Sequence, residues 1–222
     1  MVDGLQRVEL RAARAEDMAF VAGIFVASFP ESIGFFFKAS GEYDVRRVTD
    51  LVQWGFEAIL RCERNFIVAC SPARSQGAAI AGYCIYPASI RRFRKALLAR
   101  SKVISLLRDL GRRRIRVKCV EVLKLMGNKL VYFLNSRSLP NGGVDSRILS
   151  IAVAPEFRGL GMGKALLERA LSDLRQQGST EVGLEVRPDN SVALNLYERA
   201  GFIPLGRFAD AQGQWLAMVK KL

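Results

Sequence analysis

The chain has 222 residues, of which half are hydrophobic and a quarter charged, so its composition is that of a globular protein with a sizeable core. It contains no histidine, which excludes sites built on imidazole and nucleophiles that histidine activates. The longest uncharged runs, 18–30 and 75–90, are shorter than the roughly 18–20 residues of a membrane span, and the first ten residues lack the order of a secretory signal.

The net charge of +13 belongs to one segment. Residues 88–143 hold 15 lysines and arginines against Asp109 and Glu121, whereas the rest of the chain has equal numbers of basic and acidic residues. A surplus of this size repels itself, and an acidic partner would relieve that repulsion.

The first part of the chain predicts a strand, two helices and a hairpin. Residues 8–13 predict a strand, and residues 15–29 predict a helix with acidic residues in its first turn. The apolar spacing over 43–62 is that of a second helix. Two short runs rich in β-branched and aromatic residues, 65–70 and 78–87, predict the strands of the hairpin.

The basic segment predicts two amphipathic helices, over 89–111 and 112–127, followed by a turn cluster at 139–145. Nine apolar residues give the first helix one wide face: Ile90, Phe93, Leu97, Leu98, Val103, Ile104, Leu106, Leu107 and Leu110. Two interpretations follow: this face packs on the protein core or a second subunit, or it lies on an anionic membrane surface.

The last part of the chain alternates strands and helices. The pattern predicts, in order, a strand at 146–155, a glycine-rich loop, a helix ending near 177–178, a strand at 180–186, a helix at 191–201, and strands at 202–208 and 214–222.

The glycine-rich loop lies within "APEFRGLGMGKALLERAL", residues 154–171. It is not a P-loop, because Arg158 and Ala165 stand where that motif needs Gly and Ser or Thr. It is not a dinucleotide fingerprint, because Lys164 or Leu166 falls on the third glycine position. A loop whose N–H groups converge at a helix N-terminus suits a pyrophosphate, and a plain strand–turn–helix connection is the alternative.

The same residues resemble a known family. "VAPEFRGLGMGKALL" is similar to the coenzyme A-binding motif of the GNAT superfamily of N-acetyltransferases, R/Q-x-x-G-x-G/A, with Arg158, Gly161 and Gly163 in its places. "LEVRPDNSVALNLYERAGF", at 184–202, is similar to a later motif of that family.

The resemblance implies an α/β (α+β) fold in one domain over 1–222. Its sheet would be mixed and mostly antiparallel, splayed between the fourth and fifth strands and flanked by helices. Residues 88–143 have no counterpart in the minimal fold and would form a basic helical insertion.

The resemblance also implies acetyl-coenzyme A as co-substrate and no metal. Backbone groups at Ile151, Ala152 and Val153 would meet the pantetheine arm and the thioester, and an N–H near Ile151 would polarise the thioester carbonyl. Asn190 would contact the arm through its side chain. The pyrophosphate would lie on the loop residues Arg158, Gly159, Leu160, Gly161, Met162, Gly163 and Lys164.

Two side chains are the catalytic candidates under this resemblance. Tyr197 would be the acid that protonates the leaving thiolate, with a packed aromatic residue as the alternative. Glu185 would be the base that accepts the amine proton, with a surface carboxylate or an ion pair to Arg187 as the alternative. Asp145 and Ser150 are further candidates for the base.

The acceptor is a primary amine that the sequence does not identify. An amino sugar of the cell envelope, carried on a diphosphate, would suit the basic segment. The alternatives are N-terminal acetylation of a protein, of the ribosomal-protein alanine type, and a non-catalytic scaffold that binds coenzyme A or nucleic acid. The expected partners of 88–143 are an anionic membrane or a phosphorylated substrate, with nucleic acid and a homodimer as weaker alternatives. The expected location is cytoplasmic, with peripheral contact at the inner membrane surface as an alternative.

Overall fold

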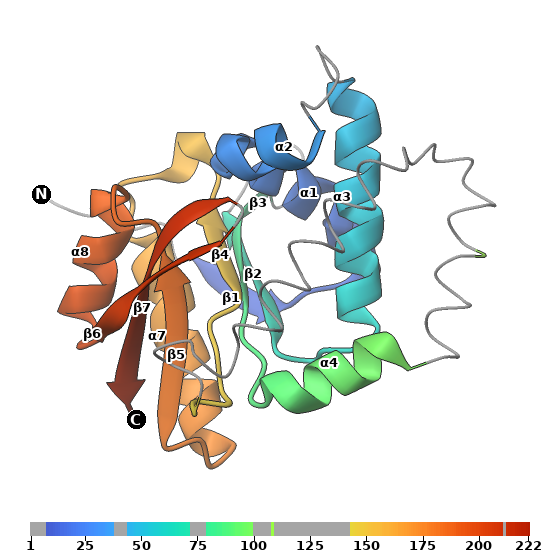
Figure 1. Ribbon diagram of the computed structural model, residues 1–222. Helices are drawn as coiled ribbons and strands as arrows, with labels where there is room; N and C mark the ends of the chain where they lie inside the picture. Colours follow the sequence, from blue (N-terminus) through green and yellow to red (C-terminus); the bar gives the residue numbers. More distant parts are fainter. Residues whose placement is uncertain (1–7, 38–43, 72–78, 100–107, 109–142, 211) are drawn as a thin grey trace, which may run out of the picture.

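The structure is a computed structural model that describes residues 8–37, 44–71, 79–99, 108, 143–210 and 212–222 (Figure 1). Its elements in chain order are β1 (Glu9–Ala12), η1 (Ala15–Asp17), α1 (Met18–Ser28), α2 (Pro30–Phe37), α3 (Val45–Leu60), β2 (Phe66–Ser71), β3 (Ala79–Ile85), α4 (Ile90–Leu98), β4 (Ser150–Val153), η2 (Pro155–Phe157), α7 (Met162–Gln176), β5 (Glu181–Val186), α8 (Ser191–Arg199), β6 (Ile203–Asp210) and β7 (Gly213–Lys221).

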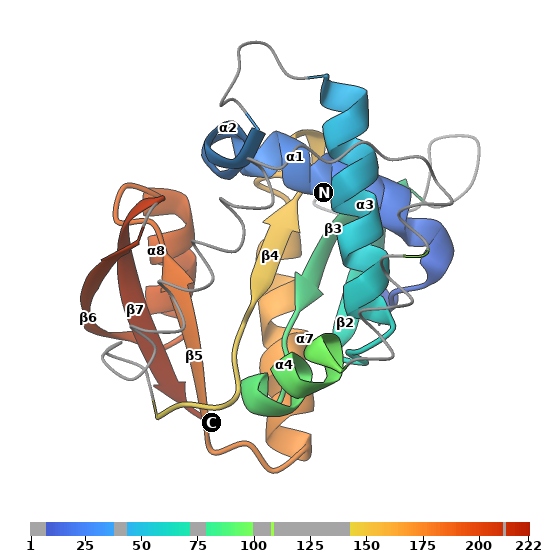
Figure 2. The ribbon, with the colours of Figure 1, turned by 45° about the vertical axis from the view of Figure 1, so that its right-hand side comes forward.

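The strands form two antiparallel sheets. The first has the order β1-β2-β3-β4 and the second the order β5-β7-β6, and an isolated parallel bridge between Arg147 and Gly183 joins them. Figure 2 shows β4 and β5 close together where they begin and far apart at their carboxyl ends. The predicted splay between the fourth and fifth strands is therefore confirmed, and it is wide enough to divide the strands into two sheets.

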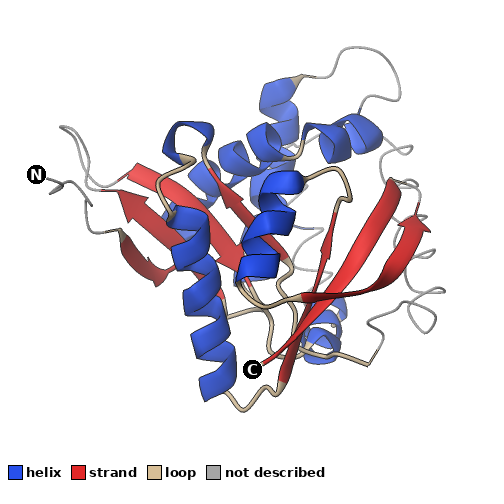
Figure 3. Ribbon diagram, turned by 90° about the vertical axis from the view of Figure 1, so that its left-hand side faces the viewer, coloured by secondary structure: helices blue, strands red, loops and turns tan. Residues whose placement is uncertain are grey.

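Helices cover both faces of the first sheet. One core cluster joins α7 and α8 to the strands and contains Leu166, Leu184 and Met218; the other joins α1 and α3 to the opposite face and contains Val21 and Tyr83. Figure 3 shows α7 and α8 in front of the strands on the first of these faces. The two clusters follow from strand alternation, which sends neighbouring side chains to opposite faces.

The N-terminal helical region differs from its prediction. The expected helix at 15–29 corresponds to η1 and α1, whereas α2 is an additional helix that begins at Pro30. Proline suits a first helical position because it has no N–H to leave unpaired. Within the described residues no single helix has the length and hydropathy of a membrane span; Ala15–Ser28 and Pro30–Phe37 meet that test only together, with a bend of 92°.

The basic segment is described only in part. α4 begins after Ser89, whose hydroxyl accepts a hydrogen bond from the Arg92 N–H at 3.2 Å. Phe93 is 7% exposed and Leu98 is 70% exposed. Phe93 thus packs inward, as the packing interpretation expects, whereas Leu98 does not, and Ile90 and Leu97 are half-buried. The remainder of the predicted apolar face, from Val103 on, and the second predicted helix lie outside the described residues.

Candidate active site

The segment that precedes β4 meets β5 at one point. The N–H of Ile148 donates to the oxygen of Gly183 at 2.9 Å, and the N–H of Gly183 donates to the oxygen of Ser146 at 3.0 Å. Beyond this contact, the described parts of the two strands belong to separate sheets. The outer edge of β4 therefore faces the space between the sheets instead of a neighbouring strand.

A β-bulge marks the place where the strands part. The N–H of Leu149 donates to the oxygen of Ile85 at 2.8 Å, and Ser150 is also paired with Ile85. Two residues of one strand thus oppose a single residue of the other, which defines a bulge and bends the strand that carries it. The bend directs β4 away from β5.

The backbone of β4 presents polar groups to this space. Ala154 donates its N–H to the oxygen of Ala81 in the direction of β3, at 2.8 Å. Because this direction alternates along a strand, the N–H groups of Ile151 and Val153 point away from β3, toward β5. Ala152 is 8% exposed, packs in the core and has its backbone on the β3 side, so the structure does not bring it to the space between the strands.

The glycine loop leaves the first turn of α7 uncapped. Gly159 and Gly161 have φ values of 79° and 78°, in the left-handed region that favours glycine. Gly161 is the N-cap of α7 and has no side chain that could accept from the first N–H groups of that helix. Such a turn, with free N–H groups and the positive end of the helix dipole, is suited to a phosphate.

The two cations of the loop are engaged by neighbours. Arg158 donates from Nε to the oxygen of Val153 and from Nη2 to Oγ of Ser28, both at 3.2 Å. Lys164 Nζ lies 3.7 Å from Glu168 Oε1. Arg158 therefore ties the loop to β4 and α1, while the backbone supplies the donors that a phosphate would meet.

Glu185 forms an ion pair with Arg147, the residue whose backbone bridges β5 before β4 begins. Arg147 Nη1 donates to Glu185 Oε1, and the two side chains are 8% and 23% exposed. Glu185 lies on the opposite face of β5 from Leu184 and Val186, as alternation predicts, since both of these pack in the α7 cluster. The predicted ion pair to Arg187 is wrong: Glu185 pairs with Arg147, and Arg187 lies near Glu31.

Arg187 fastens other elements together at the end of β5. Its guanidinium donates to the backbone oxygens of Gln212 at 2.8 Å and Gln214 at 3.2 Å, and it lies 4.0 Å from the ring centroid of Trp215. Its Nε lies 3.8 Å from Glu31 Oε2. These contacts connect the β6–β7 hairpin and α2 to the end of β5.

Tyr197 lies on the other side of β5. It is 6% exposed, packs in the cluster that contains Leu184, and meets the Phe202 ring at a centroid distance of 5.8 Å. Burial raises the pKa of Tyr197 well above its ordinary value of 10.0. Its hydroxyl is thus protonated throughout the neutral range, as an acid must be before it donates.

Asn190 acts first as a helix cap. Its Oδ1 accepts from the N–H of Ala193 at 3.1 Å and so satisfies one donor at the start of α8. The residue is exposed, and its side-chain amide N–H groups are not used by this cap.

The two further base candidates lie in different places. Asp145 accepts from the Ser89 hydroxyl at 2.6 Å and from the Arg91 N–H at 3.2 Å, which commits it to the start of α4. The Ser150 hydroxyl bonds the Tyr83 hydroxyl at 2.9 Å on the face of β4 that meets α1 and α3. Asp145 is therefore outside the splay, and Ser150 borders it.

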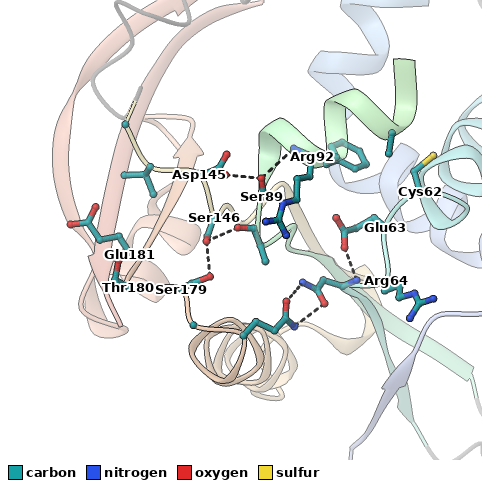
Figure 4. A pocket seen from close by; sticks show the side chains of 18 residues that line it. Cys62, Glu63, Arg64, Ser89, Arg92, Asp145, Ser146, Ser179, Thr180 and Glu181 are labelled. Carbon is teal, nitrogen blue, oxygen red and sulfur yellow. Dashed lines mark hydrogen bonds between the residues drawn. The ribbon is translucent and has the colours of Figure 1, made fainter. Parts of the chain in front are cut away.

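A cavity of about 870 Å³ lies at the opposite end of the strands from the glycine loop (Figure 4). Its wall is made by the α3–β2 connection, α4, residues 143–146 and the α7–β5 turn. Hydrogen bonds link Ser89 to Asp145 and Ser146 to Ser179 along this wall. Among the candidate residues Asp145 alone lines it, and Glu185, Tyr197, Asn190 and the glycine loop do not, so we place the candidate site at the splay and not in this cavity.

The described residues contain no group of three or more His, Cys, Asp or Glu side chains placed to hold a metal ion. Cys62, Cys70 and Cys84 are free thiols, and Cys119 lies outside the described residues.

Sequence reasoning missed Arg147 and the bulge. Arg147 was not singled out because it stands alone outside the basic segment, although a single basic residue inside a strand-like run is an informative signal of a buried partner. The residue types of Leu149 and Ser150 do not predict the bulge.

Comparisons with known proteins agree with this geometry. A family model described as the acetyltransferase (GNAT) family matches residues 104–202. An N-alpha-acetyltransferase of Sulfurisphaera tokodaii is 41% identical over 71 residues, which are 32% of this chain and 42% of that protein. A ribosomal protein bS18-alanine N-acetyltransferase of Escherichia coli is 40% identical over 58 residues, 26% of this chain and 39% of that protein. The similarity thus spans about two fifths of each curated relative.

Solved structures share the fold over almost the whole chain. The crystal structure of SsHAT matches with a TM-score of 0.66 and 18% identity, over 96% of this chain and 98% of that one. An N-acetyltransferase from Staphylococcus aureus Mu50 matches with a TM-score of 0.59 and 18% identity, over 96% and 100%. The expected α+β architecture, with antiparallel sheets flanked by helices, is therefore confirmed.

Proposed function

Because the chain belongs to the GNAT family of acetyltransferases, we propose that it transfers an acetyl group from acetyl-coenzyme A to a primary amine. One observation carries the proposal: an open strand edge and an uncapped glycine loop lie at the same end of β4. The first offers backbone groups to an extended arm and the second offers N–H groups to a pyrophosphate, which are the two parts that a coenzyme A molecule presents together.

The coenzyme would lie along β4. The N–H groups of Met162, Gly163 and Lys164 would hold the pyrophosphate at the start of α7. The amide of Asn190 would hold the pantetheine arm. The N–H of Ile151 would donate to the thioester carbonyl and stabilise the negative charge that develops on its oxygen.

Acetyl-coenzyme A supplies the activated acetyl group, and side chains of this protein would move the protons. Glu185 would accept the proton that the ammonium of the acceptor must lose before its nitrogen can attack. Tyr197 would give its proton to the departing thiolate. The attacking nitrogen and the leaving sulfur share one tetrahedral carbon, so both side chains would act at the edge of β5 that faces β4, Glu185 from one face of the strand and Tyr197 from the other.

The favoured acceptor is the α-amino group at the N-terminus of a polypeptide. Two relatives named above carry N-alpha or alanine N-acetyltransferase in their names, and a yeast N-alpha-acetyltransferase 30 is 42% identical over 57 residues. The spacing of Glu185, Asn190 and Tyr197 also resembles that of the ribosomal-protein alanine acetyltransferases. An amino sugar remains the second acceptor class to test.

A thiol-release assay with DTNB tests the proposal. Acetyl-coenzyme A is incubated with the protein and with alanine- and serine-initiated peptides, each paired with the same peptide acetylated at its N-terminus, and with glucosamine and a nucleotide-linked amino sugar. We expect thiol release with the free peptides and none with their acetylated partners. Release with amino sugars alone would replace the acceptor, and no release with any amine would overturn the proposed activity.

A further inference from the structure

We propose that Arg147 is a positioning residue for the base: it holds the Glu185 carboxylate at a fixed place opposite the backbone of β4. This inference rests on the proposed acetyltransferase function, and it adds a residue that the sequence motifs do not contain. The ion pair between Arg147 and Glu185 is the observation that carries it.

Arg147 is anchored at the point where the sheets meet. Its N–H donates to the oxygen of Pro87 at 3.0 Å, and its neighbours Ser146 and Ile148 exchange hydrogen bonds with Gly183 on β5. Its side chain is 8% exposed. The Arg147 side chain is buried and the backbone that carries it is hydrogen-bonded on both sides, so the guanidinium has little freedom to move.

The ion pair joins the residue that bridges the two sheets to a strand of the second sheet. Arg147 precedes β4 of the first sheet, and Glu185 is on β5 of the second. The proposed carbonyl-polarising N–H, at Ile151, is also on β4, and after the bulge no backbone hydrogen bond links the described parts of β4 and β5. The pair therefore extends the backbone contact at Gly183 to the Glu185 side chain, and in this way it fixes the place of the base relative to that N–H.

A glutamate without such a partner would sample several rotamers, because three of its bonds rotate. Arginine suits the role, since its planar guanidinium presents several donors in fixed directions. The Glu185 side chain keeps 23% of its surface exposed, so the pair leaves part of the carboxylate accessible. Misplacement of a reacting group by about 1 Å can lower a rate by about 10²-fold, so removal of Arg147 should be visible in turnover.

The test is a double-mutant cycle with Arg147→Gln, Glu185→Gln and the double variant, measured by thiol release with the best amine of the panel. We expect Arg147→Gln to lower kcat by about 10- to 100-fold with little change in the KM of the amine or in the melting-temperature shift caused by acetyl-coenzyme A. If Arg147 acts through Glu185, the double variant is no slower than Glu185→Gln.

Two further variants separate positioning from folding. Arg147→Lys keeps the positive charge and should recover part of the turnover that Arg147→Gln loses. If Arg147→Gln does not fold, Arg147→Lys should still fold and serves as the variant for the cycle. Arg169→Gln is the control, because Arg169 forms a 2.8 Å ion pair with Asp173 on α7, away from the proposed site. Loss of this ion pair should leave kcat unchanged.

The outcomes distinguish the inference from the function on which it rests. A wild-type protein that releases no thiol with any amine overturns the proposed function, and the role of Arg147 with it. Active wild type with full turnover in Arg147→Gln, or with losses that multiply in the double variant, overturns the positioning role alone.

Discussion

Replacement of Gly161 by glutamate should abolish coenzyme binding while leaving the protein folded. Gly161 is the N-cap of α7 with φ 78°, and a Cβ placed there meets no heavy atom within 4 Å. A side chain at this position therefore has room but adopts a left-handed backbone, which costs about 1–2 kcal/mol for a residue with a Cβ. Its carboxylate would stand where the proposed pyrophosphate lies and would repel it.

The expected sizes follow from linkage. Acetyl-coenzyme A at about one hundred times its Kd stabilises the folded state by about 2.7 kcal/mol, which for a chain of this length is a rise of about 5–11 °C in Tm. If the glutamate weakens binding about 100-fold, the same concentration adds only about 0.4 kcal/mol. Thermal unfolding with and without acetyl-coenzyme A measures both values.

Two control variants separate strain from charge. Gly161→Ala carries the backbone strain without the carboxylate and should keep most of the ligand-induced shift. Gly178→Glu has a matching φ of 81° and equally open surroundings, but it lies beyond the other end of α7. It should lose stability and keep the full shift. A full wild-type shift in Gly161→Glu would refute the placement of the phosphate site.

Three more outcomes follow from the structure. Tyr197→Phe should lower kcat by about 10²–10⁴-fold with an unchanged coenzyme-induced Tm shift; equal turnover would assign the acid role elsewhere. Burial raises the pKa values of Tyr83 and Tyr197 above their ordinary value of 10.0 and that of Cys84 above 9.0. The contribution of these groups to the free energy of unfolding is therefore complete below those pH values and falls as pH rises further. Midpoints of urea unfolding at pH 8 and 11 measure this fall, and Tyr83→Phe should reduce the difference between the two midpoints. Burial opposes ionisation of Asp17, but hydrogen bonds from Arg11 and a backbone N–H lower its pKa overall. Asp17→Asn should therefore lower the free energy of unfolding by about 3 kcal/mol at pH 7, the lower end for a broken buried ion pair, because Arg11 is 24% exposed. This loss should shrink as pH falls below 3.8, where the carboxylate of the wild type becomes protonated. A loss that stays constant down to pH 3 would contradict a stabilising role for the Asp17 charge.

The parts of the site that the sequence predicts are those that depend on neighbours in the chain. The left-handed turn at Gly161 follows from a glycine just before a helical pattern, and the side of β5 that carries Glu185 follows from strand alternation. Tyr197 lies on a helix whose spacing already places it against apolar neighbours.

The parts that the sequence does not predict depend on pairing between distant segments. The partner of Glu185 is decided by where β4 and β5 cross, so the nearby Arg187 was the more obvious choice from sequence, whereas the distant Arg147 is the actual partner. The bulge at Leu149 depends on the register of β4 against β3, which neither strand encodes alone. Pro30 marks a helix start, but the turn of 92° before it is set by packing.

The alternation of β5 gives the proposed reaction two separate proton sites. Glu185 lies on one face of the strand and Tyr197 packs against the other, so the proposed base and acid would approach the thioester from opposite sides of β5. The splay makes the arrangement usable, because the strand edge that would otherwise be paired is open to a substrate held between the sheets. Burial raises the pKa of Tyr197, so this phenol stays protonated at the alkaline pH where free amine accumulates. The acid and the deprotonated nucleophile are therefore available over the same pH range, as attack on a thioester and protonation of its leaving group both require.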